Sequence, residues 1–206
     1  PIFGQYLKGL KTIRIFSPTA QVTDSEANPV PGVDVVASLS SGSFASGQTT
    51  VSSDGIGQSA FSDLVITTVG SYSIEFNADG VSESATTQQF DVTPAAASTL
   101  TIDSGNNQSG TVGQALANPF VVLIADEFGN SIAGEEVTFE ISSTPTGSSG
   151  SALTETTVQT DANGLASTSL TLGNSAGTYE VTASADGLDA VTFTATATAG
   201  SVSTFA

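Results

Sequence analysis

The sequence predicts an all-β protein built from two copies of one small sandwich domain, preceded by a short N-terminal arm. A turn-and-strand pattern that begins at Asp24 returns at Asp126, and residues 51–80 match residues 158–187 without a gap. Apolar and polar residues alternate through short segments that are separated by Gly, Pro, Asn and Asp, which is typical of strands and turns. A repeat of about one hundred residues has the size of a domain and exceeds that of a solenoid unit.

The arm, residues 1–16, differs in composition from the rest of the chain. It holds all three cations and no acid, whereas all twenty acids follow it. Its apolar residues recur at helical spacing, but residues 12–16 alternate like a strand, so we expect a short helix or extended arm that leads into a strand. The interface residues predicted in the arm are Tyr6, Leu7, Lys8, Leu10, Lys11, Ile13 and Arg14. The alternative interpretation makes this segment the first strand of domain 1.

Domain 1 is predicted to span residues 17–93. Its strongest strand signal is Tyr72, Ile74 and Phe76, with polar residues between them that would face water. The run 54–57, Asp-Gly-Ile-Gly, predicts a hairpin because its glycines adopt positive φ easily. The other inward-facing side chains predicted here are Ala20, Val22, Val33, Val35, Ala37, Val51, Phe90 and Val92.

Domain 2 is predicted to span residues 98–197 and to repeat this scheme. About seven short strands with turn signals between them describe a two-sheet sandwich. Its predicted inward-facing residues are Leu100, Ile102, Phe120, Val122, Ile124, Val137, Phe139, Ile141, Leu170, Leu172, Tyr179, Val181, Ala183, Val191, Phe193 and Ala195. The join, residues 94–97, is short and contains a proline, so we expect it to hold the domains semi-stiffly in line.

The two copies differ at their beginnings. Domain 2 has a first strand and a Gly-rich loop between Leu100 and Val121, for which domain 1 has only the strand candidate at residues 12–16. At the other end, residues 199–205 resemble residues 95–100, where domain 2 begins. Residues 198–206 are therefore predicted to form a C-terminal strand or tail.

The composition excludes most kinds of catalysis. The chain contains no Cys and no His, so neither Ser-His-Asp nor Cys-His machinery, nor a disulfide, nor a structural zinc site can be assembled. The domains contain no Lys for a Schiff base or a phosphate loop. The run 103–105, Asp-Ser-Gly, looks like half of an aspartic-protease site, but it occurs once, in a loop, where turn chemistry explains it. We predict that the protein is not an enzyme, has no catalytic residue and binds no cofactor.

The acids at the repeated turns are candidate calcium ligands. Calcium takes six to eight oxygens, usually from several carboxylates in one loop, and no EF-hand or Gly-Asp repeat is present. Aspartate at the start of a turn normally caps backbone N–H groups. We therefore predict that Asp24 and Glu26, like Asp126 and Glu127, hold no metal, and that the aspartates act as caps.

Charge and aromatic content restrict the partners. The formal net charge is −17, and a body this acidic repels nucleic-acid phosphate and anionic lipid. No run of eighteen apolar residues occurs, so no membrane span is predicted. Tyr72 and Tyr179 fall at matching positions, which favours core or corner tyrosines over sugar-stacking platforms, and a weak contact with a host-surface glycan stays open.

Four motifs of domain 2 carry a resemblance to a known family. They are Asp126 to Phe139, Thr160 to Ala166, Gly177 to Ala183, and the leading stretch Asn107 to Gln114. In these motifs the chain resembles the bacterial Ig-like domains of group 1, the intimin and invasin type. Domain 1 matches more loosely, with Ala27 at the turn glycine and Ala37 at the Phe position.

The resemblance covers residues 17–197. It implies two tandem immunoglobulin-like β-sandwich domains of the kind used in adhesin stalks, surface fibres and phage virion proteins, and it implies no catalytic residue.

Three functional hypotheses follow. The first is a non-enzymatic display protein of a phage virion surface, as capsid decoration or fibre, in which the arm docks on a capsid, a tail or neighbouring subunits. The alternative is a bacterial cell-surface adhesin or an extracellular fibre subunit, of which this chain could be a trimmed part with its binding tip elsewhere. If the sequence is complete, Pro1 favours removal of an initiator Met and assembly from the cytoplasm.

The third hypothesis is strand donation between chains, which would make the protein oligomeric. Residues 201–205 of one chain would fill the missing first strand of domain 1 in the next chain, with Val202 and Phe205 as interface residues.

Overall fold

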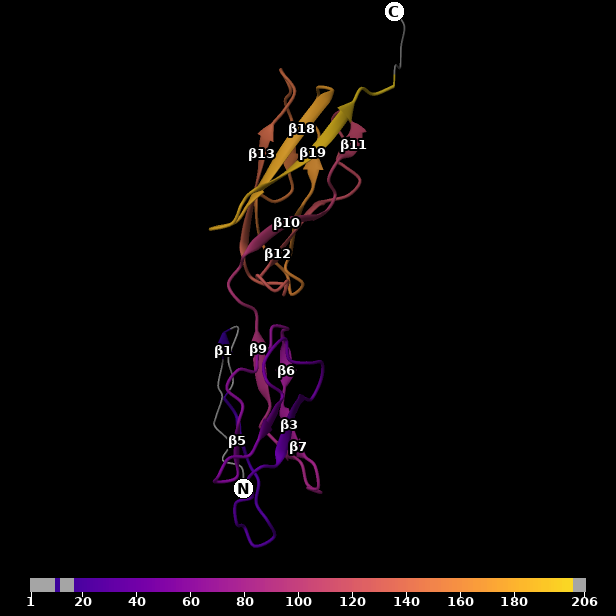
Figure 1. The fold of residues 1–206 in the computed structure, drawn as a ribbon. Helices are drawn as coiled ribbons and strands as arrows, with labels where there is room; N and C mark the ends of the chain where they lie inside the picture. Colours follow the sequence, from indigo (N-terminus) through magenta and orange to yellow (C-terminus); the bar gives the residue numbers. More distant parts are fainter. Residues whose placement is uncertain (1–9, 12–16, 202–206) are drawn as a thin grey trace, which may run out of the picture. The chain divides into compact units, whose positions relative to one another are not determined.

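The computed structural model describes residues 10–11 and 17–201, and the chain divides into two compact units, Pro1–Ala95 and Ala96–Ala206. We refer to these units as domain 1 and domain 2. Every regular element among the described residues is a β-strand (Figure 1), so the all-β prediction is confirmed. No helix in this part of the chain has the length and hydrophobicity needed to cross a membrane.

Domain 2 consists of two main sheets. One has the strand order β10-β12-β16 and the other β11-β19-β18-β13-β15, while β14 and β17 form a separate pair. All neighbours are antiparallel except β11 and β19, which are parallel. The strands are β10 (Thr99–Ser104), β11 (Gln108–Thr111), β12 (Phe120–Ala125), β13 (Glu136–Ser143), β14 (Ala152–Leu153), β15 (Thr157–Gln159), β16 (Leu165–Thr168), β17 (Leu170–Thr171), β18 (Gly177–Ser184) and β19 (Val191–Thr198). This arrangement is an immunoglobulin-like β-sandwich.

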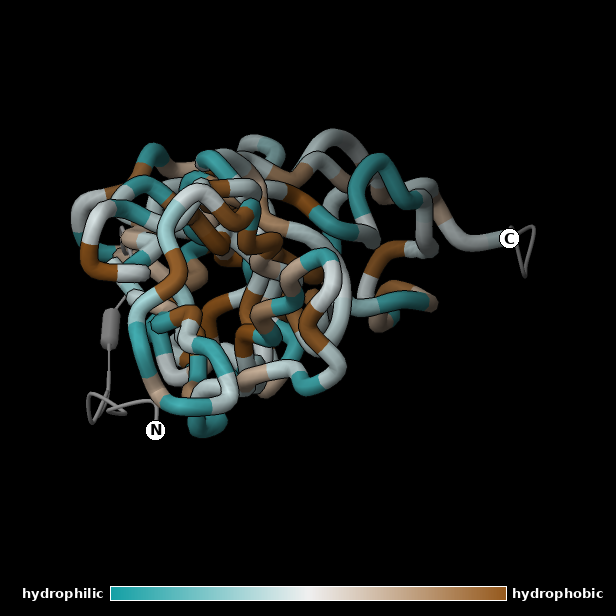
Figure 2. The backbone as a smooth tube through the Cα atoms, turned by 60° about the horizontal axis from the view of Figure 1, so that its bottom comes forward, coloured by the Kyte–Doolittle hydropathy of each residue, from teal (hydrophilic) through white to brown (hydrophobic). Residues whose placement is uncertain are grey.

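The core of domain 2 lies between these sheets. Successive strand residues point to opposite faces, and the tube in Figure 2 accordingly changes between hydrophobic and hydrophilic colours over short distances. Phe120 of β12 and Phe193 of β19 come from different sheets and stack with their ring centroids 4.6 Å apart. The predicted inward-facing residues are buried apart from Ile102, Ile141 and Val191, which are half-buried.

Domain 1 repeats this plan with shorter strands. They are β1 (Leu10–Lys11), β2 (Thr19–Gln21), β3 (Asp34–Leu39), β4 (Thr50–Ser52), β5 (Gln58–Ala60), β6 (Gly70–Tyr72), β7 (Ile74–Ala78), β8 (Ala85–Thr86) and β9 (Phe90–Thr93). The sheet orders are β2-β5, β4-β3-β7-β8 and β1-β9-β6. Strands β6 and β7 together correspond to β18, and β8 and β9 together correspond to β19.

The strand registers of the two domains agree, and this explains why domain 1 has Ala37 where the family motif has phenylalanine. Ala37 of β3 lies opposite Phe76 of β7, and the equivalent pair in domain 2 is Phe139 opposite Ala183. The phenylalanine and the alanine have exchanged strands. Because the pair keeps its summed volume, the core tolerates the exchange.

Strand β1 places part of the predicted arm in the sheet of domain 1. Leu10 pairs with Val92 and Lys11 with Thr93, both parallel, as Gly110 and Thr111 pair with the last residues of β19. For these two residues the structure supports the alternative interpretation, in which the segment supplies a strand of domain 1. The strand candidate at residues 12–16 lies outside the described residues.

Three large core residues of domain 1 were not predicted. Phe61, Leu64 and Ile66 are fully buried, and the ring of Phe61 lies 5.3 Å from that of Phe76. They belong to the segment between β5 and β6, which forms no named strand. Since a strand period is the signal that identifies inward-facing residues, irregular backbone conceals them.

One polar side chain is buried in this core without a partner. Among the described residues, Ser59 Oγ is completely buried and makes no hydrogen bond. Ser59 pairs with Ala20 on β2, and the residue at the equivalent place in domain 2, opposite Val122, is Ala166. Leaving a buried hydroxyl unpaired costs about 1–3 kcal/mol.

We predict that Ser59→Ala stabilises domain 1 by about 1 kcal/mol because it removes this unpaired hydroxyl. Calorimetry of the full chain should show the Tm of the domain 1 transition rise by roughly 4–8 °C. The matched control is Ala166→Ser, which introduces the same defect into domain 2 and should lower the Tm of the other transition. A Ser59→Ala chain less stable than the wild type would contradict the assignment.

Candidate interaction surfaces

Most of the predicted interface residues lie outside the described part of the chain. Leu10 and Lys11 form β1, and only their backbone positions are described. Tyr6, Leu7, Lys8, Ile13, Arg14, Val202 and Phe205 lie outside the described residues. The interface formed by the two ends of the chain therefore stays a prediction, and the described surfaces are the loops and the sheet edges.

Four loops in the two domains share one geometry, and each begins with an aspartate. The aspartates are Asp24, Asp54, Asp126 and Asp161. In each loop the Oδ1 atom accepts hydrogen bonds from the backbone N–H groups two and four residues later, at 2.8–3.0 Å. The N–H of each aspartate donates to the carbonyl four residues later at 2.9 Å. The prediction that the turn aspartates cap backbone N–H groups is confirmed.

The fourth residue of each loop has a positive φ. It is glycine in three loops, Gly57, Gly129 and Gly164, with φ between 74° and 84°. In the remaining loop it is Ala27, with a φ of 66°. A side chain with a Cβ is strained in this conformation, whereas glycine adopts it freely.

The cap geometry sets the acidity of two of these aspartates. The N–H groups of Leu165 and Asn163 lower the pKa of Asp161 below its ordinary value, because they stabilise the carboxylate. The side-chain amide of Asn28, with the backbone N–H of the same residue, lowers the pKa of Asp24 in the same way. Across the described residues no group of three or more acidic side chains is placed to hold a metal ion.

A buried hydroxyl ties the two aspartate loops of each domain together. Ser53 Oγ donates to the Val30 carbonyl at 2.8 Å and accepts from the Val33 N–H at 2.9 Å. Thr160 takes the same place in domain 2 and donates to the Ile132 carbonyl at 2.7 Å. In each domain this hydroxyl therefore links two neighbouring loops at the same end of the sandwich by a hydrogen bond.

The two matching tyrosines are corner residues, as predicted. Tyr72 donates its O–H to the Thr68 carbonyl at 3.1 Å, and Tyr179 donates to the Ser175 carbonyl at 2.8 Å. Both side chains are buried, so neither ring presents a face on which a sugar could stack. A tyrosine at the start of this strand, bonded to the backbone four residues upstream, is a hallmark of immunoglobulin-like sandwiches.

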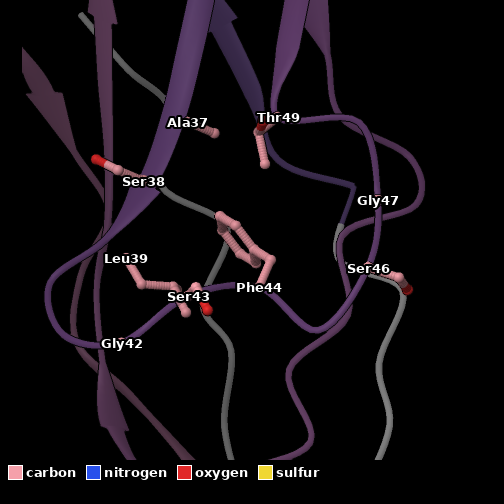
Figure 3. A pocket seen from close by; sticks show the side chains of 9 residues that line it. All are labelled: Ala37, Ser38, Leu39, Gly42, Ser43, Phe44, Ser46, Gly47 and Thr49. Carbon is pink, nitrogen blue, oxygen red and sulfur yellow. The ribbon is translucent and has the colours of Figure 1, made fainter.

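A small cavity lies beside β3 in domain 1. Figure 3 shows the ring of Phe44 within it, between Ala37 and Thr49 on one side and Leu39 on the other. Its volume is about 250 Å³, and its remaining lining residues are Ser and Gly. Ligand pockets typically measure roughly 300–1,000 Å³ and are lined mostly by apolar and aromatic side chains, with a few polar or charged groups that orient the ligand. This cavity is smaller than that range and is lined by no charged side chain.

The edge strands differ between the domains in one respect. In domain 2, β12 is covered on one side by β16 and on the other by β10. In domain 1, the equivalent strand β2 pairs with β5, and the described residues place no strand on its other side. The first strand that the sequence predicts to be missing from domain 1 would pair with the outer edge of β2, and this stays a prediction because residues 1–9 and 12–16 lie outside the described part of the chain.

We predict that Ala27→Gly stabilises domain 1 by about 1 kcal/mol, because glycine removes the strain of a positive φ. Calorimetry of the full chain measures this as a higher Tm for the domain 1 transition. Gly129→Ala is the matched control in domain 2 and should act in the opposite direction. A Cβ at Gly129 would meet nothing within 4 Å, so a loss of stability there reports on backbone conformation alone.

The lowered pKa of Asp161 predicts how domain 2 responds to acid. A carboxyl whose pKa is lower in the folded state stabilises the fold above its unfolded pKa, roughly 4, and loses that contribution as pH falls through the folded pKa. Asp161→Asn keeps an acceptor oxygen but cannot titrate. The variant should have a lower Tm than the wild type at pH 7, and the difference should vanish near pH 2.

Asp103→Asn, at an exposed aspartate outside these turns, is the control for the lost charge. If the Asp161→Asn and wild-type chains lose stability in parallel at every pH, the cap contributes nothing through its charge.

Comparison with protein-family models gives no match, and neither does comparison with curated proteins. Among solved structures, the chain is similar to the Yersinia pseudotuberculosis adhesin InvE, with 23% identity and a TM-score of 0.41 over 91% of this chain and 56% of that one. It is similar to the D0-D1 domain of intimin, with 18% identity and a TM-score of 0.33 over 86% of this chain and 88% of that one. A glycosyl hydrolase family 2 member from Bacteroides cellulosilyticus matches with 15% identity and a TM-score of 0.41 over 78% of this chain and 22% of that one.

The chain thus spans about half the length of the InvE chain and about a fifth of the glycosyl hydrolase. Intimin and an invasin-type adhesin are proteins of the kind that the sequence motifs resemble, and the likeness concerns the immunoglobulin-like fold.

Proposed function

We propose that this chain is a non-enzymatic spacer of an extracellular or bacterial cell-surface fibre, built from immunoglobulin-like domains that resist tension along the chain. The observation that carries this proposal is the parallel pairing of an early strand with the last strand in each domain. In domain 2, Gln108–Thr111 pairs along its whole length with Ala195–Thr198. In domain 1, β1 pairs with β9 in the same way.

Parallel pairing determines how a domain responds to a pull on its two ends. The early strand is drawn backwards along its axis and the last strand forwards, so all the hydrogen bonds between them are sheared together. In an antiparallel pair pulled from adjacent ends, the bonds would break one after another. A parallel pair of terminal strands therefore suits a domain that transmits force between its ends.

Continuity of the chain between domains supports the same role. Strand β9 ends at Thr93, and β10 begins at Thr99. The intervening segment already joins domain 2, since the Ser98 N–H donates to the Ala125 carbonyl at 2.9 Å. The last strand of one domain thus leads into the first strand of the next, which is how a serial array of modules is connected.

The surface chemistry is that of a spacer. Residues 17–206 carry twenty acids and no base, and within the described part of the chain no group of three or more of these acids is placed to hold a metal ion. A strongly acidic surface keeps a protein soluble, and its self-repulsion is screened at the ionic strength of an extracellular medium. Partners in this proposal are other proteins of the same surface assembly.

A virion surface is the second setting that we consider. One observation favours it, namely the restriction of all three cations to residues 1–16, which suits an arm that docks on an acidic capsid or tail. Co-purification of the chain with virions, or with the cell envelope of the organism that encodes it, separates the two settings.

Single-molecule pulling on the ends of the full chain tests the mechanical role. We predict two unfolding steps that release roughly 25 nm for domain 1 and roughly 30 nm for domain 2, since an extended chain spans about 3.5 Å per residue and the folded length of each domain is subtracted. Domain 2 should yield at the higher force, because four residue pairs join β11 to β19, whereas two join the described residues of β1 and β9.

The control changes the direction of the pull while leaving the fold intact. The chain has no cysteine, so handles can be placed at will, and Ala176→Cys with Ala199→Cys pulls β18 and β19 apart from adjacent ends. This geometry should open domain 2 at a clearly lower force. Equal forces in the two geometries would show that the parallel pair does not resist tension, and the spacer proposal would lose its support.

A further inference from the structure

The connection between β10 and β11 determines how a pull on domain 2 reaches the parallel pair of β11 and β19. Strand β10 ends at Ser104 in the sheet β10-β12-β16, and β11 begins at Gln108 in the five-stranded sheet. Residues 105–107 therefore carry the chain from one sheet to the other, and we call this segment the crossover. A pull that enters along β10 arrives at β11 from the opposite sheet, at an angle to the strand. An oblique pull separates a strand from its neighbour one hydrogen bond at a time, beginning at the end that is pulled.

The side chain of Asn106 holds the beginning of β11 on β19. Its Oδ1 accepts from the Thr194 N–H at 2.8 Å and from the Asn107 N–H at 2.8 Å, and the Asn107 N–H also donates to the Thr194 carbonyl at 2.9 Å. Both backbone groups of Thr194 are thus bound one residue before the paired segment, in which Gln108 lies opposite Ala195. The amide oxygen of Asn106 extends the ladder by taking the place of a backbone carbonyl.

The side chain of Gln108 ties the crossover to the sheet that contains β12. Its Nε2 donates to the Gly105 carbonyl at 2.6 Å and to the Asn118 carbonyl at 2.9 Å, while its Oε1 accepts from the Asn118 N–H at 3.0 Å. Asn118 stands two residues before β12. The half-buried amide thus uses both its nitrogen and its oxygen to join the beginning of β11, the crossover and the segment that enters β12.

The backbone at Gly105 leaves the crossover no room to swing. Gly105 has a φ of 87°, which glycine adopts freely. A Cβ at this position would clash with the Pro119 carbonyl oxygen and would lie 3.0 Å from the Phe120 Cα. The crossover is therefore in direct backbone contact with the segment that enters β12. Its path is fixed by this contact as well as by the two amide side chains.

We propose, on the basis of the mechanical role proposed above, that Asn106 and Gln108 are positioning residues for the parallel pair of β11 and β19. They hold the first residues of β11 in place, so that a pull arriving through β10 acts along the axis of β11 and shears all its hydrogen bonds together. Without them, the same pull peels β11 from β19 beginning at the crossover. The run 105–108, Gly-Asn-Asn-Gln, is the sequence that forms this device.

Constant-force pulling on the full chain tests this assignment. Asn106→Ala removes the bond to Thr194 at the first point of load, so domain 2 should rupture roughly fivefold faster than in the wild type when it is pulled through the chain ends. Gln108→Ala should act in the same direction. In the Ala176→Cys, Ala199→Cys background, which pulls β18 and β19 apart, both variants should rupture at the rate of that background, because this geometry does not load the crossover.

Conservative substitutions separate the hydrogen bonds from the side-chain volume. Asn106→Asp keeps the acceptor oxygen and should restore the wild-type rupture rate. Gln108→Glu keeps the acceptor but loses both donor bonds, so it should rupture as fast as Gln108→Ala. The comparison variant is Thr168→Val, which removes a bond from Thr168 Oγ1 to the Glu155 carbonyl at 2.7 Å in β16, a strand that pairs with β12. It should change the rupture rate by the same factor in both pulling directions.

The proposal is overturned if Asn106→Ala and Gln108→Ala change the rupture rate by the same factor in both directions or in neither, or if Asn106→Asp ruptures as fast as Asn106→Ala. When the wild type still resists a pull on its ends more strongly than a pull between β18 and β19, these results leave the spacer proposal standing. Equal wild-type forces in the two directions overturn the spacer proposal and this assignment with it. Calorimetry checks that both domains remain folded in each variant.

Discussion

Each domain depends on the burial of alternate side chains between two sheets. This constraint fixes the register of every strand, since a slip by one residue would turn a whole row of apolar side chains toward water. It also explains which differences between the domains are tolerated. Phe76 opposite Ala37 and Ala183 opposite Phe139 fill the same volume from opposite strands, so the sandwich survives although the motif residue has moved.

In the aspartate loops of each sandwich, side chains form hydrogen bonds with the backbone of the same loop or of a neighbouring one. Asp126 and its three counterparts use their carboxylates to cap the backbone of their own turns, and Ser53 or Thr160 ties neighbouring loops together. Polar groups engaged in this way hold the fold and are not arranged to receive a substrate or a metal ion. Where a protein partner binds a sheet edge by strand addition, specificity comes from register and from the side chains that alternate along the added strand.

Sequence alone predicted the fold class, the repeat, the corner tyrosines and the caps, because each has a local signature such as a period of two or an aspartate before a turn glycine. It missed Phe61, Leu64 and Ile66, since their burial depends on irregular backbone that has no period. It assigned Leu10 and Lys11 to an arm, although they pair with β9, because pairing between residues so far apart leaves no local pattern. The strand missing from the start of domain 1 stays a prediction, and only the pairing of β2 with β5 shows which backbone groups of β2 point away from β5.

The central claim is that the two domains share one pairing plan and differ at one edge: β10 covers β12 in domain 2, whereas the described residues place no strand beside the outer edge of β2. Amide hydrogen exchange of the full chain tests it at two equivalent positions, Gln21 and Leu123, whose pairing partners on β5 and β16 correspond. The N–H of Gln21 should exchange rapidly because it points away from β5, whereas that of Leu123 should exchange slowly because it faces β10. Protection of Gln21 equal to that of Leu123 would show that the edge is already covered, and the claim would fail.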